Sequence, residues 1–460
     1  MKYVSTRGGI EPIGFRETVM MGLGRDGGLV VPDTIPDARG RLAAWRNLGY
    51  QELALEIMRL FVDIPDSDLA ELIAASYSAF DDPAIVRVVE AGKVRILELF
   101  HGPTLAFKDL ALQFLGRLFE YVLAGSGREL NILAATSGDT GSSAIHGVRG
   151  RKGIRIFVLH PHKRVSRIQE LQMTTVMDRN VHNLAIEGTF DDCQAIVKKL
   201  FNDLEFRDRY SLGAVNSINW ARILAQIVYY FNGAFRVMEE SGSSKVRFAV
   251  PTGNFGDIFA GYMAARMGLP IGLLVLAAND NDILARFFNR GDYSIASVRA
   301  TLSPSMDIQV ASNFERYLYY RLGCDPMRVR RAMEDFERTG RLDSSLVGSE
   351  SDRLFAAGSA GREQTLSAIR RYYEKHGYLL DPHTAVGVHV AEGWLDPEEP
   401  MICLATAHPA KFGEAVKLAV GKDIARHPRL DALEGLPTRC EVLPNSASAV
   451  RDYIEGAIGA

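Results

Sequence analysis

From residue 94 onward, short and mainly apolar runs alternate with segments of helical periodicity, and this alternation restricts the fold more than any other feature of the chain. The runs of strand length cover residues 94–99, 131–135, 154–159, 181–186, 246–250, 271–276 and 401–406. Strands that are apolar on both sides are typical of parallel sheets covered by helices on both faces. The sequence therefore predicts an α/β fold built on parallel sheets.

The chain of 460 residues divides into three ranges of different character. Residues 1–92 are mixed and mainly helical in periodicity, whereas 93–240 and 241–460 each carry strand–loop–helix units. A length prior of about 150 residues per domain fits three domains. We therefore predict an N-terminal domain and two α/β domains with these bounds. Residues 280–361 are polar and rich in Gly and Arg, and we interpret them as helical insertions over an active-site mouth.

Charge and composition exclude several classes of partner. With 53 basic and 56 acidic residues the net charge is −3, and no basic stripe indicates nucleic acid or a membrane surface. The longest apolar run, residues 271–278, is too short to cross a bilayer, and the N-terminus lacks the apolar core of a signal peptide. The four cysteines lie far apart, and neither they nor the histidines have metal-ligand spacing. We expect a metal-free cytoplasmic enzyme.

One lysine stands at the start of a strongly apolar helical segment. Lys108 follows a Pro-Thr turn and precedes the apolar positions Leu110, Ala111, Leu112, Phe114, Leu115, Leu118, Phe119 and Val122. A desolvated lysine loses its proton readily and becomes an amine nucleophile, which is what Schiff-base chemistry needs. The alternative, which this position alone favours, is a solvated lysine whose stem lies on apolar surface. The rest of the sequence has to decide between them.

Two glycine-containing loops each connect a short apolar strand to a helix, at residues 136–141 and 252–257. Glycine lets the backbone approach an anion closely, and the free N–H groups of a helix start bind it. Neither loop has the GxxxxGK[ST] or GxGxxG pattern, which disfavours nucleotide-binding folds. A tight turn without a ligand is the alternative for either loop alone. Two different loops favour two anions, a phosphate cofactor and an anionic substrate.

Two further polar positions remain open between a structural and a functional interpretation. In the segment 216–222, Asn, Ser and Arg side chains suit a phosphate, but its Asn and Ser residues also suit a helix cap, which the sequence alone favours. Thr406 ends the last apolar strand, where ligands of open α/β sheets bind, and is a candidate partner for a ring; a simple strand-end hydroxyl is the alternative.

Taken together, these motifs resemble the threonine synthase family, and most closely its longer bacterial and fungal branch. The resemblance covers nearly the whole chain and is carried by residues 3–8, 22–32, 101–109, 137–141, 216–219, 251–257 and 406–412. It implies a fold-type II pyridoxal-phosphate (PLP) enzyme, like the β subunit of tryptophan synthase, with a cleft between two α/β domains and an additional N-terminal domain. The implied cofactor is PLP, and the implied substrate is O-phospho-L-homoserine.

The resemblance also implies site residues. Lys108 would bind the cofactor covalently, with Phe107 beside the ring and Thr406 at the pyridine nitrogen. The cofactor phosphate would lie, mostly on backbone N–H groups, in a cradle formed by Gly253, Asn254, Phe255, Gly256 and Asp257. Substrate would be bound at its carboxylate by Ser137, Asp139 and Thr140, and at its phosphate by Asn216, Ser217 and Arg222.

The implied reaction is the last step of threonine biosynthesis, in which O-phosphohomoserine and water give threonine and phosphate by γ-elimination and β-addition of water. Lys108 would be the catalytic residue and general base. Two alternatives are a related PLP-dependent phospho-lyase or dehydratase that releases a keto acid, and an inactive PLP-binding homologue, although no motif is broken. We expect a monomer, with a homodimer as the alternative, because no dimerisation segment is evident in the sequence.

Overall fold

The computed structural model describes residues 1–343 and 352–459. Its contacts divide the chain into two compact units. Unit 1 comprises Met1–Ala111 and Ser217–Ala425, and unit 2 comprises Leu112–Asn216 together with the chain from Arg426 onward. Unit 1 thus collects residues from all three of the sequential ranges predicted above, because unit 2 is inserted into it after Ala111 and receives the C-terminal segment as well.

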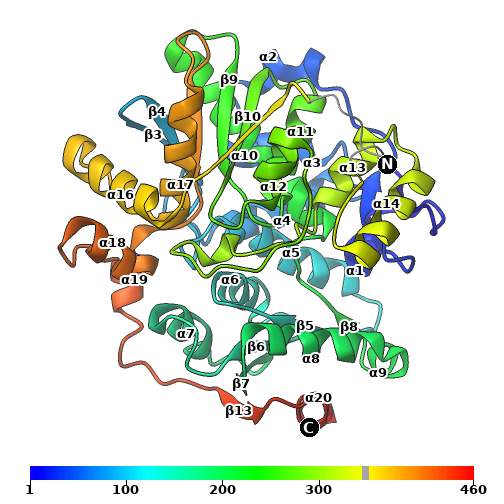
Figure 1. Ribbon diagram of the computed structural model, residues 1–460. Helices are drawn as coiled ribbons and strands as arrows, with labels where there is room; N and C mark the ends of the chain where they lie inside the picture. The colour runs from blue at the N-terminus through cyan, green and yellow to red at the C-terminus, as the bar shows by residue number, and fades with distance from the viewer. Residues whose placement is uncertain (344–351, 460) are drawn as a thin grey trace. The chain divides into compact units, whose positions relative to one another are not determined.

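Unit 1 is built on a six-stranded sheet (Figure 1). In spatial order the strands are β11 (Phe355–Ser359), β10 (Ile271–Ala278), β9 (Val246–Pro251), β12 (Met401–Ala405), β4 (Val94–Glu98) and β3 (Arg87–Ala91). All neighbouring pairs are parallel except the β3–β4 hairpin. The parallel pairing confirms the prediction from the apolar runs.

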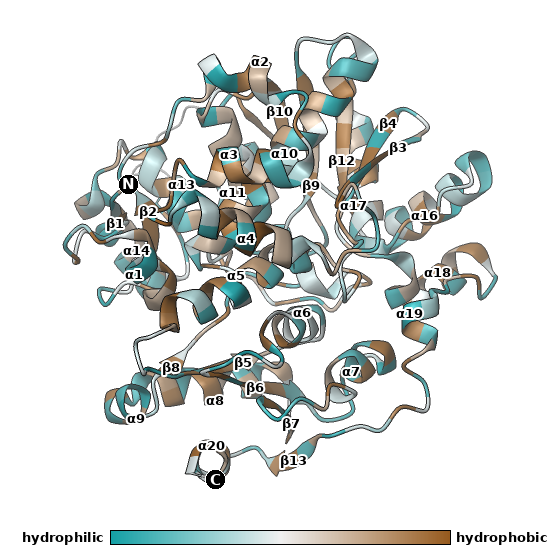
Figure 2. Ribbon diagram, turned by 180° about the vertical axis from the view of Figure 1, so that it is seen from behind, coloured by the Kyte–Doolittle hydropathy of each residue, from teal (hydrophilic) through white to brown (hydrophobic). Residues whose placement is uncertain are grey.

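Helices cover both faces of this sheet. Along the strands, alternate residues such as Ile96, Val275 and Cys403 join one apolar core with α16 (Arg362–His376) and α17 (Pro382–Ala391). The intervening residues face the other way: a Cβ on Gly233 of α10 (Trp220–Ser241) would lie 2.8 Å from Leu97 Cδ2. Because both faces are buried, the central strands of the sheet are mainly apolar, as the predominantly brown β12 shows in Figure 2.

The remaining elements of unit 1 comprise a two-stranded antiparallel sheet and shorter helices. The sheet pairs β1 (Tyr3–Ser5) with β2 (Val30–Pro32). The further α-helices are α1 (Phe15–Met21), α2 (Leu42–Trp45), α3 (Tyr50–Met58), α4 (Asp66–Tyr77), α11 (Gly256–Arg266), α12 (Ile283–Arg290), α13 (Phe314–Arg321), α14 (Pro326–Thr339) and α18 (Gly413–Val420). The 3-10 turns lie at Arg39–Arg41, Pro304–Met306, Glu392–Trp394 and Pro409–Phe412.

Unit 2 has its own five-stranded sheet, which is parallel throughout. Its order is β13 (Glu441–Pro444), β7 (Val181–Glu187), β6 (Ile154–Pro161), β5 (Leu130–Ala135) and β8 (Leu212–Gly213). The helices are α6 (Asp139–Val148), α7 (Arg167–Thr174), α8 (Phe190–Asn202), α9 (Leu204–Arg209), α19 (Pro428–Asp431) and α20 (Ala447–Gly459), while α5 (Lys108–Leu123) begins in unit 1 and continues into unit 2.

Every predicted strand from residue 94 onward is present, and the exposure of short edge strands explains why some others were missed. Strands β3 and β13 carry exposed charged positions and lack a continuous apolar run. Within the described part of residues 280–361, α12, α13 and α14 bear out the helical interpretation, but β11 adds a sheet-edge strand. Residues 344–351 of that region lie outside the described residues.

Candidate active site

Lys108 is the first residue of α5, and its side chain is 9% exposed. The ammonium Nζ lies 5.1 Å from the centroid of the Phe107 ring. The preceding turn is fixed from within, because the buried Asp109 carboxylate accepts hydrogen bonds from Thr104 N–H and Thr104 Oγ1, both at 2.7 Å. The solvated alternative is therefore wrong for this lysine. A buried amine at a rigid helix start is suited to covalent chemistry.

The turn before Lys108 is also paired with the strand end that carries Thr406. Phe107 N–H donates to Thr406 O at 2.8 Å, and His408 N–H donates to Leu105 O at 3.0 Å. Leu105 itself has a positive φ of 60°, a conformation that costs free energy for a side-chain-bearing residue. Thr406 directly follows β12 and is 7% exposed. Tertiary pairing thus brings Lys108 and Thr406, which lie about 300 positions apart in sequence, to adjoining backbone segments.

The loop 252–257 connects β9 to α11. Its Phe255 has φ 63° and ψ 0°, and its ring is buried among Phe288, Phe314 and Tyr317. A Cβ on Gly253 would lie 2.7 Å from Ser305 O, so glycine is required at this position. The Phe255 side chain therefore anchors the loop, and only its backbone is available to an anion.

The side chain of Asp257 points into the protein. Its Oδ1 accepts hydrogen bonds from Tyr229 Oη at 2.6 Å and Tyr230 Oη at 2.9 Å, both from α10. Burial raises the pKa of the carboxyl to about 6, and the hydrogen bonds from the two tyrosines oppose this rise. This carboxylate fastens the first turn of α11 to α10. Like Phe255, it can contribute to an anion site through its N–H group.

The loop 136–141 belongs to unit 2 and connects β5 to α6. Thr136 Oγ1 accepts from Gly138 N–H at 3.0 Å and from Gly141 N–H at 2.8 Å. Gln169 Nε2 donates to the buried Asp139 carboxylate at 2.8 Å. Ser137 is exposed and Thr140 is half-buried, so both hydroxyls remain near the surface of the loop, whereas Asp139 is held inside it.

Segment 216–222 divides between the two interpretations that the sequence left open. Asn219 is the helix cap: its Oδ1 accepts from Ala221 N–H at 3.1 Å, and its Nδ2 donates to Val19 O. Asn216 is exposed and Ser217 half-buried, so neither is needed for the cap. Arg222 is 3% exposed, and burial lowers the pKa of its guanidinium to about 10. A buried guanidinium of this kind suits a phosphate.

Sequence reasoning assigned no role to Lys411, which the structure buries to 3% exposure. Its Nζ donates to Thr104 O at 2.6 Å, within the turn that Asp109 also holds. The signal was present, because a lysine follows the strand end in the apolar turn Ala407–Phe412. A second omission is the buried pair His383–Asp381, with Nδ1 and Oδ1 2.9 Å apart.

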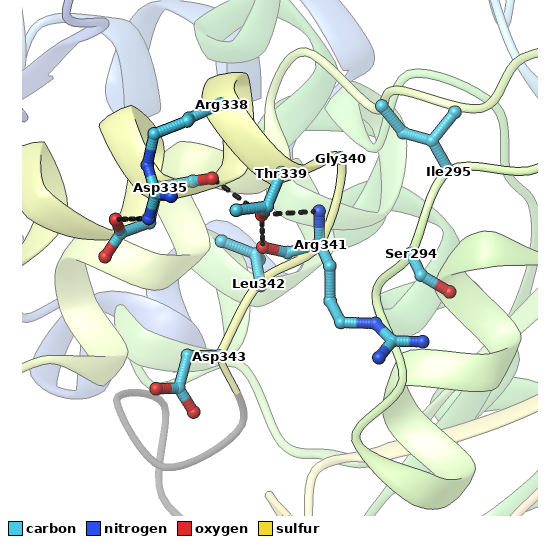
Figure 3. A pocket seen from close by; sticks show the side chains of 9 residues that line it. All are labelled: Ser294, Ile295, Asp335, Arg338, Thr339, Gly340, Arg341, Leu342 and Asp343. Carbon is cyan, nitrogen blue, oxygen red and sulfur yellow. Dashed lines mark hydrogen bonds and ion pairs between the residues drawn. The ribbon is translucent and has the colours of Figure 1, made fainter.

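A separate cavity of about 710 Å³ lies at the C-terminal end of α14 (Figure 3). None of the predicted site residues lines it. Arg338 pairs there with Asp335 at 2.9 Å, and Thr339 Oγ1 donates to the backbone at Asp335 and Arg341. Its polar groups are therefore engaged with one another or exposed, and the cavity carries no catalytic constellation.

The residues of unit 1 fit PLP. The cofactor needs an amine for its aldehyde, N–H groups for its phosphate and a partner for its ring nitrogen. Lys108 offers a buried amine, the backbone of 253–257 offers a glycine-lined helix start that a Cβ at Gly253 would obstruct, and Thr406 offers a buried hydroxyl at a strand end. Among the described residues, no group of His, Cys, Asp or Glu could hold a metal ion. Nor does any helix in the described ranges have the length and apolarity to cross a membrane.

Comparisons with known proteins agree with this fit. The family described as "Pyridoxal-phosphate dependent enzyme" matches residues 91–407, while "Threonine synthase N terminus" matches 2–77 and "Threonine synthase, C-terminal" matches 384–454. Threonine synthase of Pseudomonas aeruginosa is 46% identical, with 99% of this chain and 98% of the relative covered.

Solved structures give the same result. The PLP-bound threonine synthase of Brucella melitensis superposes with a TM-score of 0.95 at 46% identity, with 100% of both chains covered. The yeast enzyme gives 0.94 at 42% identity, with 100% of this chain and 99% of the yeast chain covered. The fold-type II architecture expected from the sequence is thereby confirmed. The chain belongs to the threonine synthase family of pyridoxal-phosphate-dependent enzymes.

Proposed function

We propose that this protein is a threonine synthase that converts O-phospho-L-homoserine and water to L-threonine and phosphate. The observation that carries the proposal is the buried Lys108 at a turn locked to the Thr406 strand end, in a chain whose full length matches threonine synthases. Lys108 would hold PLP through its amine, Phe107 would lie beside the ring, and Thr406 would meet the ring nitrogen. When bound, PLP supplies the electron sink that allows a proton to be removed from a carbon of an amino-acid substrate.

The cofactor phosphate would be held by backbone N–H groups of Gly253, Asn254, Phe255, Gly256 and Asp257. The side chains at 255 and 257 are committed to the aromatic cluster and to the tyrosines of α10, so they would fix the loop without touching the phosphate. Thr406 offers a neutral hydroxyl, which cannot keep a ring nitrogen protonated as a carboxylate would. The electron sink is therefore milder than one paired with an aspartate.

Lys108 would also move protons once it is released from the cofactor. A lysine is a general base only when its amine is neutral, and a largely desolvated environment favours the neutral form. The Thr104–Asp109 hydrogen bonds and the Lys411 contact hold the turn from which Lys108 projects, so the amine keeps one position through successive transfers. Because its amine stays in one position, one lysine could exchange protons with both the α and the β carbon of the substrate.

Substrate would be bound by two other groups of residues. Ser137, Asp139 and Thr140 would receive its carboxylate at the start of α6, with Asp139 acting through the loop geometry that Gln169 fixes. Asn216, Ser217 and Arg222 would receive its phosphate, and the buried guanidinium of Arg222 would supply most of the charge. Expulsion of water from these charged groups strengthens each contact.

The decisive experiment is product analysis with the purified holoenzyme. Incubation with O-phosphohomoserine should release threonine and phosphate in equal amounts. A keto acid in place of threonine would contradict the proposal and favour the phospho-lyase. Release of neither product, with PLP still bound, would favour the inactive homologue. Monomeric state and cytoplasmic location are further proposals, which light scattering and cell fractionation test.

A further inference from the structure

Asn313, which directly precedes α13, and Arg316, within α13, hold both segments proposed to bind phosphate, residues 253–257 and 216–222. Asn313 N–H and Nδ2 donate to Asn254 O at 3.0 and 3.2 Å, within the cofactor-phosphate loop. The same Nδ2 donates to Ser217 O at 3.2 Å, within the substrate-phosphate segment. One amide side chain thus engages carbonyls of two loops that lie 37 positions apart in the sequence.

Arg316 extends this contact, since its Nη1 donates to Asn313 Oδ1 and its Nη2 donates to Ile218 O. Its Nε and Nη2 also reach Val30 O, both at 3.0 Å, which ties the pair to strand β2. The side chain is fully buried, with the guanidinium 5.7 Å from the ring of Trp220 at the start of α10. The geometry leaves no freedom for Asn313 to rotate without breaking several bonds.

The carbonyls that this pair engages are those that would repel an anion. A peptide group is planar and trans, so its C=O and N–H point in opposite directions. Fastening the carbonyls of Asn254, Ser217 and Ile218 to Asn313 and Arg316 therefore turns the N–H groups of the following residues to the other side. A row of N–H groups with their carbonyls held away is the arrangement that binds anions.

The charge of Arg316 gives a second, independent indication. Across residues 1–343 and 352–459, no carboxylate forms an ion pair with this guanidinium; the neighbouring Glu315 pairs with Arg7 and accepts from Thr6, and only its charge acts on Arg316 from a longer distance. Burial lowers the pKa of Arg316 to about 9. A buried cation without a directly paired counter-charge is costly, and a further nearby anion lowers that cost. Bound phosphate groups beside the two segments would provide that compensation.

We propose that Asn313 and Arg316 form one positioning unit that orients the N–H groups for two phosphates, that of PLP at 253–257 and that of the substrate at 216–222. The substrate part rests on the proposed function, whereas the PLP part rests on the family. Neither residue is proposed to touch a phosphate. Weakening the unit should therefore impair both anion sites together.

The test uses the purified holoenzyme, with the apparent Kd for PLP, the Kd for inorganic phosphate and the Tm measured for each variant. Asn313→Ser removes the shared donor, and Arg316→Lys keeps the charge but removes the guanidinium fork. Each should raise both dissociation constants by about tenfold, the effect of losing one to two buried hydrogen bonds. Loss of Tm with both constants unchanged would reduce the pair to a structural role, and a rise in only one constant would overturn the shared unit.

Matched controls separate positioning from general destabilisation. Asn180→Ser removes an amide that donates to Val148 O and Ile154 O in unit 2, and Arg247→Lys removes a guanidinium that pairs with Glu399 and Asp396. Both should lower the Tm and leave both dissociation constants unchanged. If Asn313→Ser fails to fold, Asn313→Asp replaces it, because the carboxylate still accepts from Arg316 while the donor to Asn254 O and Ser217 O is lost. A folded Asn313→Asp protein with normal affinity for PLP and phosphate would overturn the proposal.

None of these binding measurements depends on turnover. If the enzyme released a keto acid from O-phosphohomoserine, the proposed function would fail while the positioning test kept its meaning. Conversely, the wild-type enzyme could produce threonine while the Asn313 and Arg316 variants bound PLP and phosphate normally, and then only the positioning proposal would fail. The two proposals therefore fail separately.

Discussion

The two glycine-containing loops are proposed to serve the same kind of task and are held in different ways. Loop 136–141 holds itself: Thr136 Oγ1 accepts from two N–H groups of the same loop. Loop 252–257 is held from outside, by Asn313 on the Asn254 carbonyl and by an aromatic cluster around Phe255. Loop 136–141 also receives a hydrogen bond from Gln169 and donates one to Leu159 O, both within about 35 positions, whereas loop 252–257 depends on residues about 60 positions further along the chain. A change in the conformation of loop 136–141 would mainly break bonds within it, whereas a change in loop 252–257 would break its contacts with other segments.

The largest effect is expected at Lys108, the proposed anchor of the cofactor. Lys108→Ala should lower kcat by about 10⁴-fold or more, since it removes the covalent anchor and the general base together. Borohydride reduction followed by peptide mapping should label Lys108 in the wild-type holoenzyme and nothing in the variant. Lys152→Ala, at an exposed lysine, is the control and should retain full activity. A label on another lysine of the wild type would refute the assignment.

Adding a methyl group to each loop tests the difference in how they are held. In Gly253→Ala the new Cβ would meet the Ser305 carbonyl at 2.7 Å, and that backbone cannot move aside cheaply. We expect the apparent Kd for PLP to rise about 10- to 100-fold, equivalent to 1.4–2.7 kcal/mol.

The matched change in the other loop is Gly138→Ala. There the Cβ would meet the end of the Gln169 side chain at 2.4 Å, and φ is 143°, so the strain falls on this loop and on the Gln169 side chain that contacts it. We expect KM for O-phosphohomoserine to rise about tenfold with the Kd for PLP unchanged. Equal loss of PLP affinity in both variants would show that the two loops are not separable.

A smaller effect is expected from the contact of Gln169 with loop 136–141. Gln169→Ala removes the 2.8 Å hydrogen bond to the buried Asp139 carboxylate and leaves the Thr136 contacts intact. We expect KM to rise about 3- to 10-fold, the cost of a single lost bond to a charged group that water can partly replace. Steady-state kinetics and a PLP titration check this result. A large change in PLP affinity would mean that Gln169 matters beyond its own loop.

The smallest effect on the cofactor is expected at Asp257. Its folded pKa of about 6 lies above the ordinary value of 3.8, so the folded protein takes up a proton more readily than the unfolded chain. Its contribution to stability is therefore full below pH 3.8 and is lost as pH rises through 6. Asp257→Asn should flatten this dependence, by at most about 3 kcal/mol. Denaturation between pH 4 and 7 measures it.

The same variant tests whether residue 257 contributes only its backbone. The asparagine Oδ1 can still accept from Tyr229 and Tyr230, so the first turn of α11 should stay in place. The apparent Kd for PLP should then change by less than about twofold. A marked loss of PLP affinity at neutral pH would assign the carboxylate a direct role in the cofactor site.

Much of the fold was predictable because its signals are local. The buried parallel strand β12 is apolar at every position, and β9 is apolar except at the partly buried Arg247, so the strand–helix alternation follows directly from the order of residues. Lys108 was recognisable once the loops around it were considered together. The half-exposed strands β3 and β13 and the edge strand β11 were not, because their sequences give no continuous apolar run or lie in a polar region.

The candidate site residues likewise divide into those with a local sequence signal and those without one. Sequence reasoning singled out Lys108, Thr406 and both loops as candidates, since each stands beside a strand or helix boundary. It assigned no role to Lys411, Asn313 or Arg316, because their importance comes from which distant carbonyls they reach. It also left open whether Asn219 caps a helix, which its bond to Ala221 N–H decides.

The sequence by itself determined the α/β class and the membership of a PLP-dependent family, and it made Lys108 the candidate nucleophile. The class, the family and the choice of Lys108 as the candidate nucleophile depend on residue type and on spacing over a few positions. Only the tertiary structure decided that unit 2 is inserted into unit 1, that Lys108 and Thr406 lie on paired segments, and that Phe255 and Asp257 turn their side chains inward. The reason is physical: a strand or a turn is stabilised by its own neighbours, whereas the direction of a side chain in a loop is decided by whatever distant group satisfies its polar atoms or buries its ring.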